Sequence, residues 1–330
     1  MAPNYFLLGT ALFMLLNSAA VAVYLERRIS GFIQNRYGPN RVGPIGLLQP
    51  IADVLKLILK EDVTPIKGYR FLHTIAPMIP VATALMTIAV IPFASGLFVT
   101  DINAGVLYLL AIASLSVYGV TLAGWSSNSK YSLLGGLRAA AQMLSYELPM
   151  GMAIASCILF ASSLSLVDVV DSQEMWWNLF RNPIGFVIFV VAAFAEANRT
   201  PFDLVEAEQE LVGGFHTEYS SMKFGMFFLA EYMHMVVASM LISTFFMGGY
   251  HLPFAEAWLP AMSAGAETAL GVAVFTIKTL FWMFVFIWVR WTIPRFKYNQ
   301  LMKLGWSKML PLSIVNFMVI AIIMFAIYGI

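Results

Sequence analysis

The chain has 330 residues, of which 60% are hydrophobic and 11% charged, and its mean hydropathy is +0.79. This composition is too apolar for a water-soluble globular protein, and it predicts an all-α integral membrane protein that crosses the bilayer several times. The net charge of +1 gives no indication of nucleic-acid binding. The single cysteine, Cys157, excludes an intrachain disulfide and cannot supply the ligands of an iron–sulfur cluster.

Eight apolar runs are long enough to span a bilayer, which takes about 20 residues with some allowance for tilt. They lie near 4–25, 72–98, 102–125, 139–166, 183–198, 224–249, 268–289 and 309–329. The fifth is the weakest, because it is short and ends in Glu196. The first lacks a basic leader and a small-residue cleavage pattern, which indicates a retained helix rather than a removed signal. With no internal repeat or low-complexity linker, we expect a single polytopic membrane domain over 1–330.

Lysine and arginine are distributed unevenly between the runs. Eight lie in 26–71, two in 126–138, two in 199–223 and five in 290–308, whereas the alternate connections hold only Arg181. The remaining one, Lys278, lies inside the seventh run. Because basic residues concentrate on the cytoplasmic side of membrane proteins, these four connections are predicted on the inner face and both termini on the outer face.

The first inner connection predicts a helix on the membrane surface. Turn-forming Gly and Pro residues at 38–44 precede Pro50, which opens a helical pattern over 50–60. On that helix Asp53 and two lysines share one polar stripe, and apolar side chains cover the rest. A surface helix without any ligand would show the same pattern, so the pattern alone leaves its role open.

Charged or titratable residues inside apolar runs are rare and usually functional. Glu147 is followed by a long uncharged stretch, which indicates either a proton path or a structural hydrogen bond in the bundle interior. Lys278 lies in the middle of its run, which predicts a carboxylate partner across the bundle. His234, one turn after Glu231, is interpreted as a core histidine rather than a proton relay.

Seven of the chain's 18 acidic residues lie between positions 196 and 231, against only Arg199 and Lys223. They are Glu196, Asp203, Glu206, Glu208, Glu210, Glu218 and Glu231. Thr200 is a suitable N-cap for a short helix, on which Asp203, Glu206 and Glu210 would share one stripe while Glu208 points elsewhere. Where water is scarce, such carboxylates titrate as a coupled set that can hold protons. A solvated acidic helix is the alternative, but the flanking intramembrane Glu196 and Glu231 favour proton handling.

Four long segments carry a resemblance to a known family. They are YLERRISGFIQNRYGPNRVGPIGLLQPIADVLKLILKE, GWSSNSKYSLLGGLRAAAQMLSYE, AEANRTPFDLVEAEQELVGGFHTEYSSMKFGMFFLAEY and WVRWTIPRFKYNQLMKLGWSKMLP. In this order they resemble the family of the H-type membrane subunit of bacterial respiratory complex I, whose mitochondrial counterpart is subunit 1 of NADH dehydrogenase. The resemblance implies eight transmembrane helices and one amphipathic surface helix at the junction of the membrane and peripheral arms. One departure is Asn299, where the family pattern leads us to expect aspartate.

The resemblance also implies roles for individual residues. A quinone chamber, reached from the bilayer between the first, surface and sixth helices, would be lined or framed by Glu26, Arg27, Arg36, Asp53 and Phe228. A proton link from that chamber would be formed by Glu147, Glu196, Asp203, Glu206, Glu208, Glu210, Glu218 and Glu231. Basic positions on the inner face are matched by Arg199, Arg290 and Arg295.

The function implied is that of a subunit, inactive alone, of a proton-translocating NADH:quinone oxidoreductase in the bacterial inner membrane. Its substrate would be quinone, with no metal or iron–sulfur cluster held by this chain. Its partners would be the lipid bilayer, iron–sulfur subunits of the peripheral arm, and small and antiporter-like membrane subunits. An equivalent subunit of a ferredoxin- or hydrogenase-linked complex stays open. A cation/proton antiporter or a membrane scaffold is a further alternative, although the missing inverted repeat argues against an antiporter.

Overall fold

The computed structural model describes residues 4–203, 212–253 and 263–328. Within these ranges the regular secondary structure is helical, with one isolated bridge between Ala94 and Leu97. The helices are α1 (Tyr5–Ile33), α2 (Gln49–Leu59), α3 (Arg70–Ile75), α4 (Met78–Thr87), α5 (Gly105–Ser126), α6 (Lys130–Ala161), α7 (Leu166–Asp171), α8 (Asn178–Arg181), α9 (Pro183–Glu196), α11 (Ser221–Phe246), α13 (Ala264–Thr292), α14 (Tyr298–Leu304) and α15 (Leu310–Tyr328). Short turns are η1 (Pro44–Gly46), η2 (Ile88–Val90), η3 (Gly214–His216) and η4 (Gly305–Met309). The predicted all-α membrane class is confirmed.

Seven helical segments of the described chain are long and apolar enough to cross a membrane. Two of them are composite: Arg70–Val90 contains α3, α4 and η2, and Tyr298–Ile327 contains α14, η4 and most of α15. The break between α3 and α4 falls at Pro77, because proline lacks the backbone donor that an unbroken helix uses. The fifth predicted run corresponds to α9, which has only 14 residues. At 1.5 Å per residue α9 is about 21 Å long, short of a hydrocarbon core of about 30 Å.

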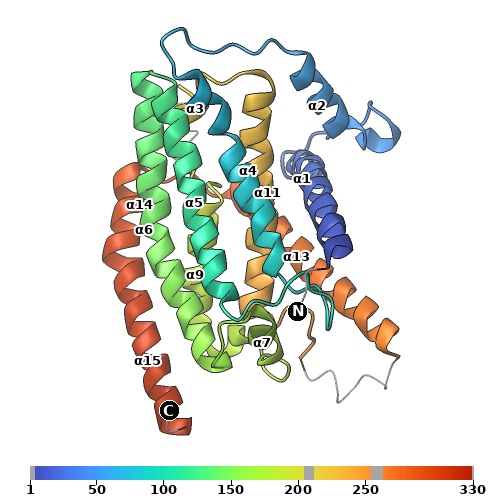
Figure 1. Ribbon diagram of the computed structural model, residues 1–330, viewed down its shortest axis with the longest axis vertical. Coiled ribbons are helices and arrows are strands. Elements are labelled where there is room, and N and C mark those ends of the chain that lie inside the picture. The colour runs from blue at the N-terminus through green and yellow to red at the C-terminus, as the bar shows by residue number, and fades with distance from the viewer. Residues whose placement is uncertain (1–3, 204–211, 254–262, 329–330) are drawn as a thin grey trace.

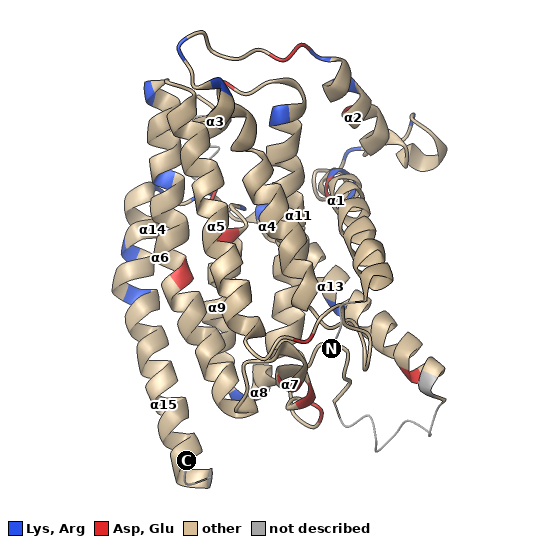
Figure 2. Ribbon diagram, viewed as in Figure 1, with Lys and Arg blue, Asp and Glu red and all other residues tan. Residues whose placement is uncertain are grey.

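The helices form a bundle with two distinct ends (Figure 1). α2 and α3 lie at one end with the start of α11, and the two chain termini lie toward the other end with α7. The predicted surface helix is α2, which lies beside the bundle and buries none of its residues. Figure 2 shows many of the Lys and Arg residues toward the end that carries α2 and α3. Many of the basic residues therefore lie toward one end, while the side of the membrane on which that end lies stays a prediction.

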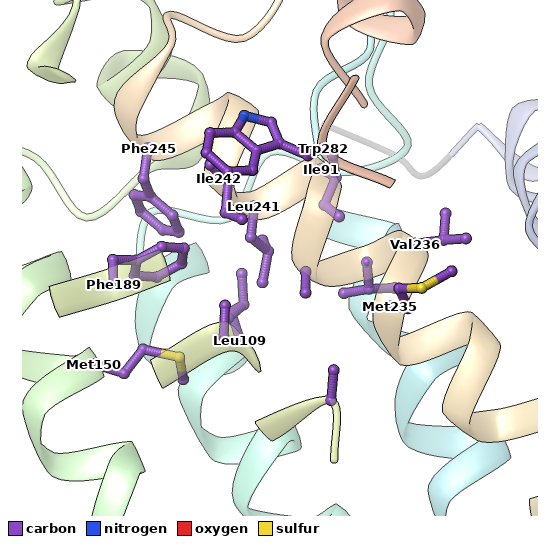
Figure 3. Close-up of a cluster of buried hydrophobic side chains, with 14 of the residues drawn as sticks. Ile91, Leu109, Met150, Phe189, Met235, Val236, Leu241, Ile242, Phe245 and Trp282 are labelled. Carbon is purple, nitrogen blue, oxygen red and sulfur yellow. The ribbon is translucent and has the colours of Figure 1, made fainter. Parts of the chain in front are cut away.

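The hydrophobic core is centred on α5, α6, α9, α11 and α13 (Figure 3). Phe189 of α9 points at Phe245 of α11, with ring centroids 5.9 Å apart, and Met150 and Leu109 come in from α6 and α5. This packing buries the last turn of α9, from Ala192 to Ala195, whereas Ile184 and Val187 nearer its start are exposed. Its end is therefore shielded from lipid.

The segment 197–203, which follows α9, consists of turns and irregular backbone, yet it is buried. Irregular backbone inside a membrane protein needs protein partners, because lipid offers no hydrogen bonds. Gln142 of α6 donates to the carbonyl of Ala195 over 2.9 Å, and the amide of Phe296 donates to the carbonyl of Pro201 over 3.1 Å. The segment is thus fixed inside the bundle. The helix predicted after Thr200 falls mostly on residues 204–211, which lie outside the described residues.

Candidate functional site

Four charged side chains from four separate parts of the chain meet inside the bundle. They are Glu26 of α1, Arg199 of the segment after α9, Glu231 of α11 and Arg290 of α13. Arg199 lies between the two carboxylates, with Nη1 3.3 Å from Oε2 of Glu26 and Nε 3.1 Å from Oε1 of Glu231. Nη1 of Arg290 lies 2.7 Å from the other oxygen of Glu26. These four residues are termed the charge cluster.

The charge cluster is largely removed from solvent, and its centre is removed most completely. The side chains of Arg199 and Glu26 are 2% and 7% exposed. Burial by itself would lower the pKa of the Arg199 guanidinium, but the carboxylates of Glu231 and Glu26 outweigh that effect and raise this pKa above its ordinary value. The ring of Tyr232 adds a cation–π contact, with its centroid 4.2 Å from the guanidinium carbon. Arg199 is therefore a fixed positive charge between two acids.

The residues expected at the quinone chamber lie around the ends of α1 and α2. Arg27 follows Glu26 in α1, and its Nη1 lies 2.6 Å from a carboxylate oxygen of Asp53 in α2. Arg36 donates hydrogen bonds to the side chains of Gln34 and Ser30, which hold it against the end of α1. The structure therefore brings Arg27 and Asp53 together, and Arg27 follows Glu26 of the charge cluster in the sequence of α1.

A row of aromatic rings on α11 leads to the charge cluster. Phe228 lies 5.3 Å from Phe224 and 6.1 Å from Tyr232 between ring centroids, as expected for side chains one helical turn apart. Phe228 is 36% exposed, whereas Tyr232 is buried against Arg199. The row thus joins an accessible aromatic face to the buried arginine.

A small cavity of about 50 Å³ adjoins the charge cluster. Glu196 and Glu231 line it, together with His216 and His234. One water needs about 10–15 Å³ and polar partners, so this cavity has room for water. His234 Nε2 lies 3.1 Å from the carbonyl oxygen of Pro80, which agrees with a satisfied core histidine. Burial lowers the pKa of His216 to about 4, so this side chain is neutral near pH 7.

The remaining acids of the proposed proton link are placed differently. Glu147 of α6 accepts a hydrogen bond from Ser114 of α5 over 3.3 Å. Asp203 is buried and pairs with Arg295 at 3.0 Å. Glu218 is exposed on the connection that leads to α11. Glu206, Glu208 and Glu210 fall in the range 204–211, outside the described residues, so their shared stripe stays a prediction.

Lys278 corrects one expectation, because its partners among the described residues are carbonyls rather than a carboxylate. Its ammonium donates to the backbone oxygens of Met247, Gly249 and His251 over 2.6, 2.8 and 2.6 Å. These three acceptors use all the protons of an ammonium group. The Trp177 ring lies against the same group, with its centroid 4.6 Å from Nζ. Lys278 therefore fixes the turn that follows α11.

The sequence does not reveal the central place of Arg199, because the resemblance groups it with the inner-face basic positions. The available signal is its position three residues after Glu196, at the end of an apolar run. Among the described residues, no group of three or more His, Cys, Asp and Glu side chains is placed to hold a metal ion.

Seven helical segments of the described chain that are long and apolar enough to cross a membrane place the protein among integral membrane proteins, in which buried ionisable groups are rare and usually functional. The matching family model is described as NADH dehydrogenase and covers residues 7–321. The chain belongs to this family, as its motifs predicted.

Three relatives show how close the similarity is. The chain is 56% identical to the H subunit of NADH-quinone oxidoreductase from Salinibacter ruber, over 98% of this chain and 97% of the relative. It is 58% identical to NADH-quinone oxidoreductase subunit 8 of Rhodothermus marinus, over 93% of each chain. It is 50% identical to the H subunit of the same enzyme from Leptospira biflexa, over 91% of this chain and 88% of the relative.

Proposed function

We propose that this chain is the quinone-binding, proton-path subunit of a proton-translocating NADH:quinone oxidoreductase. It forms the quinone chamber at the junction with the peripheral arm, and it couples quinone reduction to proton pumping. Its partners are iron–sulfur subunits of the peripheral arm and small and antiporter-like membrane subunits. It lies as one membrane domain in a bacterial inner membrane, with both termini outside. The observation that carries the proposal is Arg199, which joins Glu26, on the quinone side, to Glu231, on the proton side.

The side chains around Arg27 suit a quinone head group. The ring oxygens of a quinone accept hydrogen bonds, and its flat ring stacks on aromatic side chains. Arg27 is 46% exposed and can donate, and Arg36, in the turn that follows α1, offers a second guanidinium. Phe228 offers an exposed aromatic face. The apolar face of α2 suits the tail, which must reach the head-group site from the bilayer.

Reduction of the bound quinone places new negative charge beside Arg27 until protons are taken up. Two unit charges 4 Å apart interact by about 4 kcal/mol at an effective dielectric of about 20. A change of this size alters which nearby groups hold a proton. Glu26 adjoins Arg27 in sequence and touches Arg199 and Arg290, so the change reaches the charge cluster at once.

Glu231 connects the charge cluster to the proton path. It touches Arg199 on one side and lines the small cavity on the other, where Glu196 is the second carboxyl group. Water in that cavity links the two carboxyl groups by hydrogen bonds. The carboxylates from Asp203 to Glu218 and the intramembrane Glu147 extend the path from there.

The test removes one side chain of the Arg27–Asp53 pair in the assembled complex. Both side chains are partly exposed, at 46% and 32%, so the ion pair adds only about 0–1 kcal/mol and the complex still assembles. Arg27→Ala and Asp53→Ala should lower NADH:quinone turnover while electron transfer from NADH to an artificial acceptor at the upstream module is unchanged. Lys56→Ala, on the same surface helix and exposed, is the matched control and should keep both activities.

Two results would speak against the quinone role. Equal loss of both activities in the two variants would indicate misassembly rather than a defective quinone site. Unchanged quinone turnover in both variants would show that the pair does not frame the chamber.

A further inference from the structure

A second cavity, of about 270 Å³, lies between α1, α11, α13 and the hairpin that follows η2. Its floor consists of buried side chains, among them Leu15, Ile88 and Phe275. Its rim carries Met14 of α1 and Leu280 of α13, which are 69% and 44% exposed. A cavity with a buried floor and an exposed rim opens sideways from the bundle. It is termed the lateral groove.

The lateral groove has the chemistry of a hydrocarbon surface. None of its lining residues is charged. Four hydroxyl groups line it, and each donates its hydrogen to a carbonyl of its own helix: Thr10 to Leu7, Ser18 to Leu15, Thr276 to Val272 and Thr279 to Phe275. These hydroxyls therefore add no donor for a polar ligand. The occupant that fits this lining is an uncharged, apolar chain.

The length of the lateral groove matches one leaflet of a bilayer. Its lining extends along α1 from Leu7 to Ser18, which at 1.5 Å per residue is roughly 16 Å. Half of a hydrocarbon core of about 30 Å is about 15 Å. We propose that the lateral groove binds one acyl chain of a phospholipid, from the leaflet at the end of the bundle that carries the chain termini.

The surroundings of the groove favour a lipid over the tail of the quinone. On α1, Phe6, Phe13 and Met14 are exposed, so the groove is continuous with the lipid-facing surface of the bundle. Arg27 lies nine residues beyond Ser18, roughly 13 Å further along the helix. A chain confined to the groove thus has its head group at the end opposite Arg27. Lipid tails are as apolar as the groove, so an acyl chain gains no hydrophobic free energy by leaving the bilayer. Shape and van der Waals contact therefore decide whether it prefers the groove to the bulk bilayer.

The test uses the purified complex in nanodiscs that contain phosphatidylethanolamine with a photoreactive diazirine in its acyl chain. Cross-links are mapped by mass spectrometry. Floor labelling should be seen in the wild type at lining residues that keep some accessible surface, such as Leu97 and Met240. Thr276→Trp fills the groove from its rim and should reduce floor labelling roughly tenfold, since the ligand loses most of its packing contacts. Ile277→Trp, at an adjacent lipid-exposed position outside the lining, is the matched control and should leave it unchanged.

Three results would overturn the proposal. Absence of floor labelling in the wild type would mean that a partner subunit covers the groove or that no lipid enters it. Equal loss of labelling in Thr276→Trp and Ile277→Trp would mean that the cross-links do not depend on a lipid chain inside the groove. Floor labelling by a quinone with a diazirine in its tail, not displaced by excess phospholipid, would assign the groove to the quinone instead. None of these results bears on the Arg27 and Asp53 variants, so the quinone proposal is tested separately.

Discussion

Replacing Arg199 with methionine would remove the positive charge at the centre of the charge cluster while keeping most of the side chain's apolar stem. Glu26 would keep Arg290 at 2.7 Å, whereas Glu231 would lose its 3.1 Å contact with Arg199. Removing one partner of a buried ion pair costs about 3–5 kcal/mol, because the other charge is left in a poor solvent. We therefore expect Arg199→Met to lower the stability of the complex strongly, unless a carboxylate of the charge cluster takes up a proton.

Thermal inactivation of the purified complex measures this effect. A large membrane complex unfolds irreversibly, so the inactivation rate at a fixed temperature is the proper quantity. Each 1.4 kcal/mol changes a rate constant about tenfold. If the lost stability raises the free energy of the native state alone, the Arg199→Met complex should be inactivated at least about a hundredfold faster than the wild type. Adding Glu231→Gln removes the stranded charge, and the double variant should recover up to about 3 kcal/mol. Neither variant should couple quinone reduction to pumping.

Lys223→Met serves as the control for loss of a cation. Lys223 pairs with Asp62 at 2.9 Å, but that carboxylate is half exposed, so the change should cost under about 1 kcal/mol. If Arg199→Met is inactivated no faster than Lys223→Met and still pumps at the wild-type rate, then Arg199 does not join the quinone side to the proton side.

Three further predictions follow from the described geometry and the sequence pattern. In intact cells, a membrane-impermeant thiol reagent should label Asp101→Cys but not Tyr131→Cys, both of which are exposed; the opposite pattern would invert the topology. Glu206→Gln or Glu210→Gln should depress quinone turnover and pumping together in an assembled complex, and Glu208→Gln should do less; wild-type pumping in the first two, or greatest sensitivity at Glu208, would contradict the shared stripe. Lys278→Met should lower the thermal stability by about 2–5 kcal/mol, because three carbonyls in buried or part-buried positions lose their donor, and the number of protons pumped per quinone should not change. A stability equal to wild type would show that the turn holds without the ammonium.

The parts of the fold that depend on local pattern were predictable. A run of about 20 apolar residues identifies a span, because lipid requires every backbone group to bond within its own helix. The helix that follows Pro50 was predictable from its periodic pattern, while its place on the membrane surface stays a prediction. The pairing of Arg27 with Asp53 was not predicted, because it depends on α1 and α2 lying close together at one end of the bundle.

The charge cluster was not predictable from the sequence pattern, because its residues come from separate helices that meet only in the folded bundle. Glu26 and Arg199 are separated by 173 residues, and no local periodicity links them. Lys278 shows a second limit. Its acceptors are backbone carbonyls, which every residue carries, so the sequence around Lys278 gives no sign that they converge there. The sequence indicated the short length of α9 only through the weakness of the fifth apolar run. The buried irregular segment that follows α9 could not be predicted, because it depends on the contact of Gln142 from α6 with the end of α9.

The position of the charge cluster at the end of α9 explains why Glu231 is the acid through which a proton would enter. A buried ion cluster is weak support for stability, since apolar residues of similar volume often serve as well, so its presence is better explained by a need for charge at this place. Arg199 stays cationic, so any change of charge in the cluster must occur on a carboxylate. Glu26 lies between Arg199 and Arg290 and does not line the cavity. Glu231 meets both conditions, because it touches Arg199 and also lines the cavity that it shares with Glu196. On the proposed function, we therefore expect charge that develops beside Arg27 to be answered by proton uptake at Glu231, which contacts Arg199 and lines the cavity.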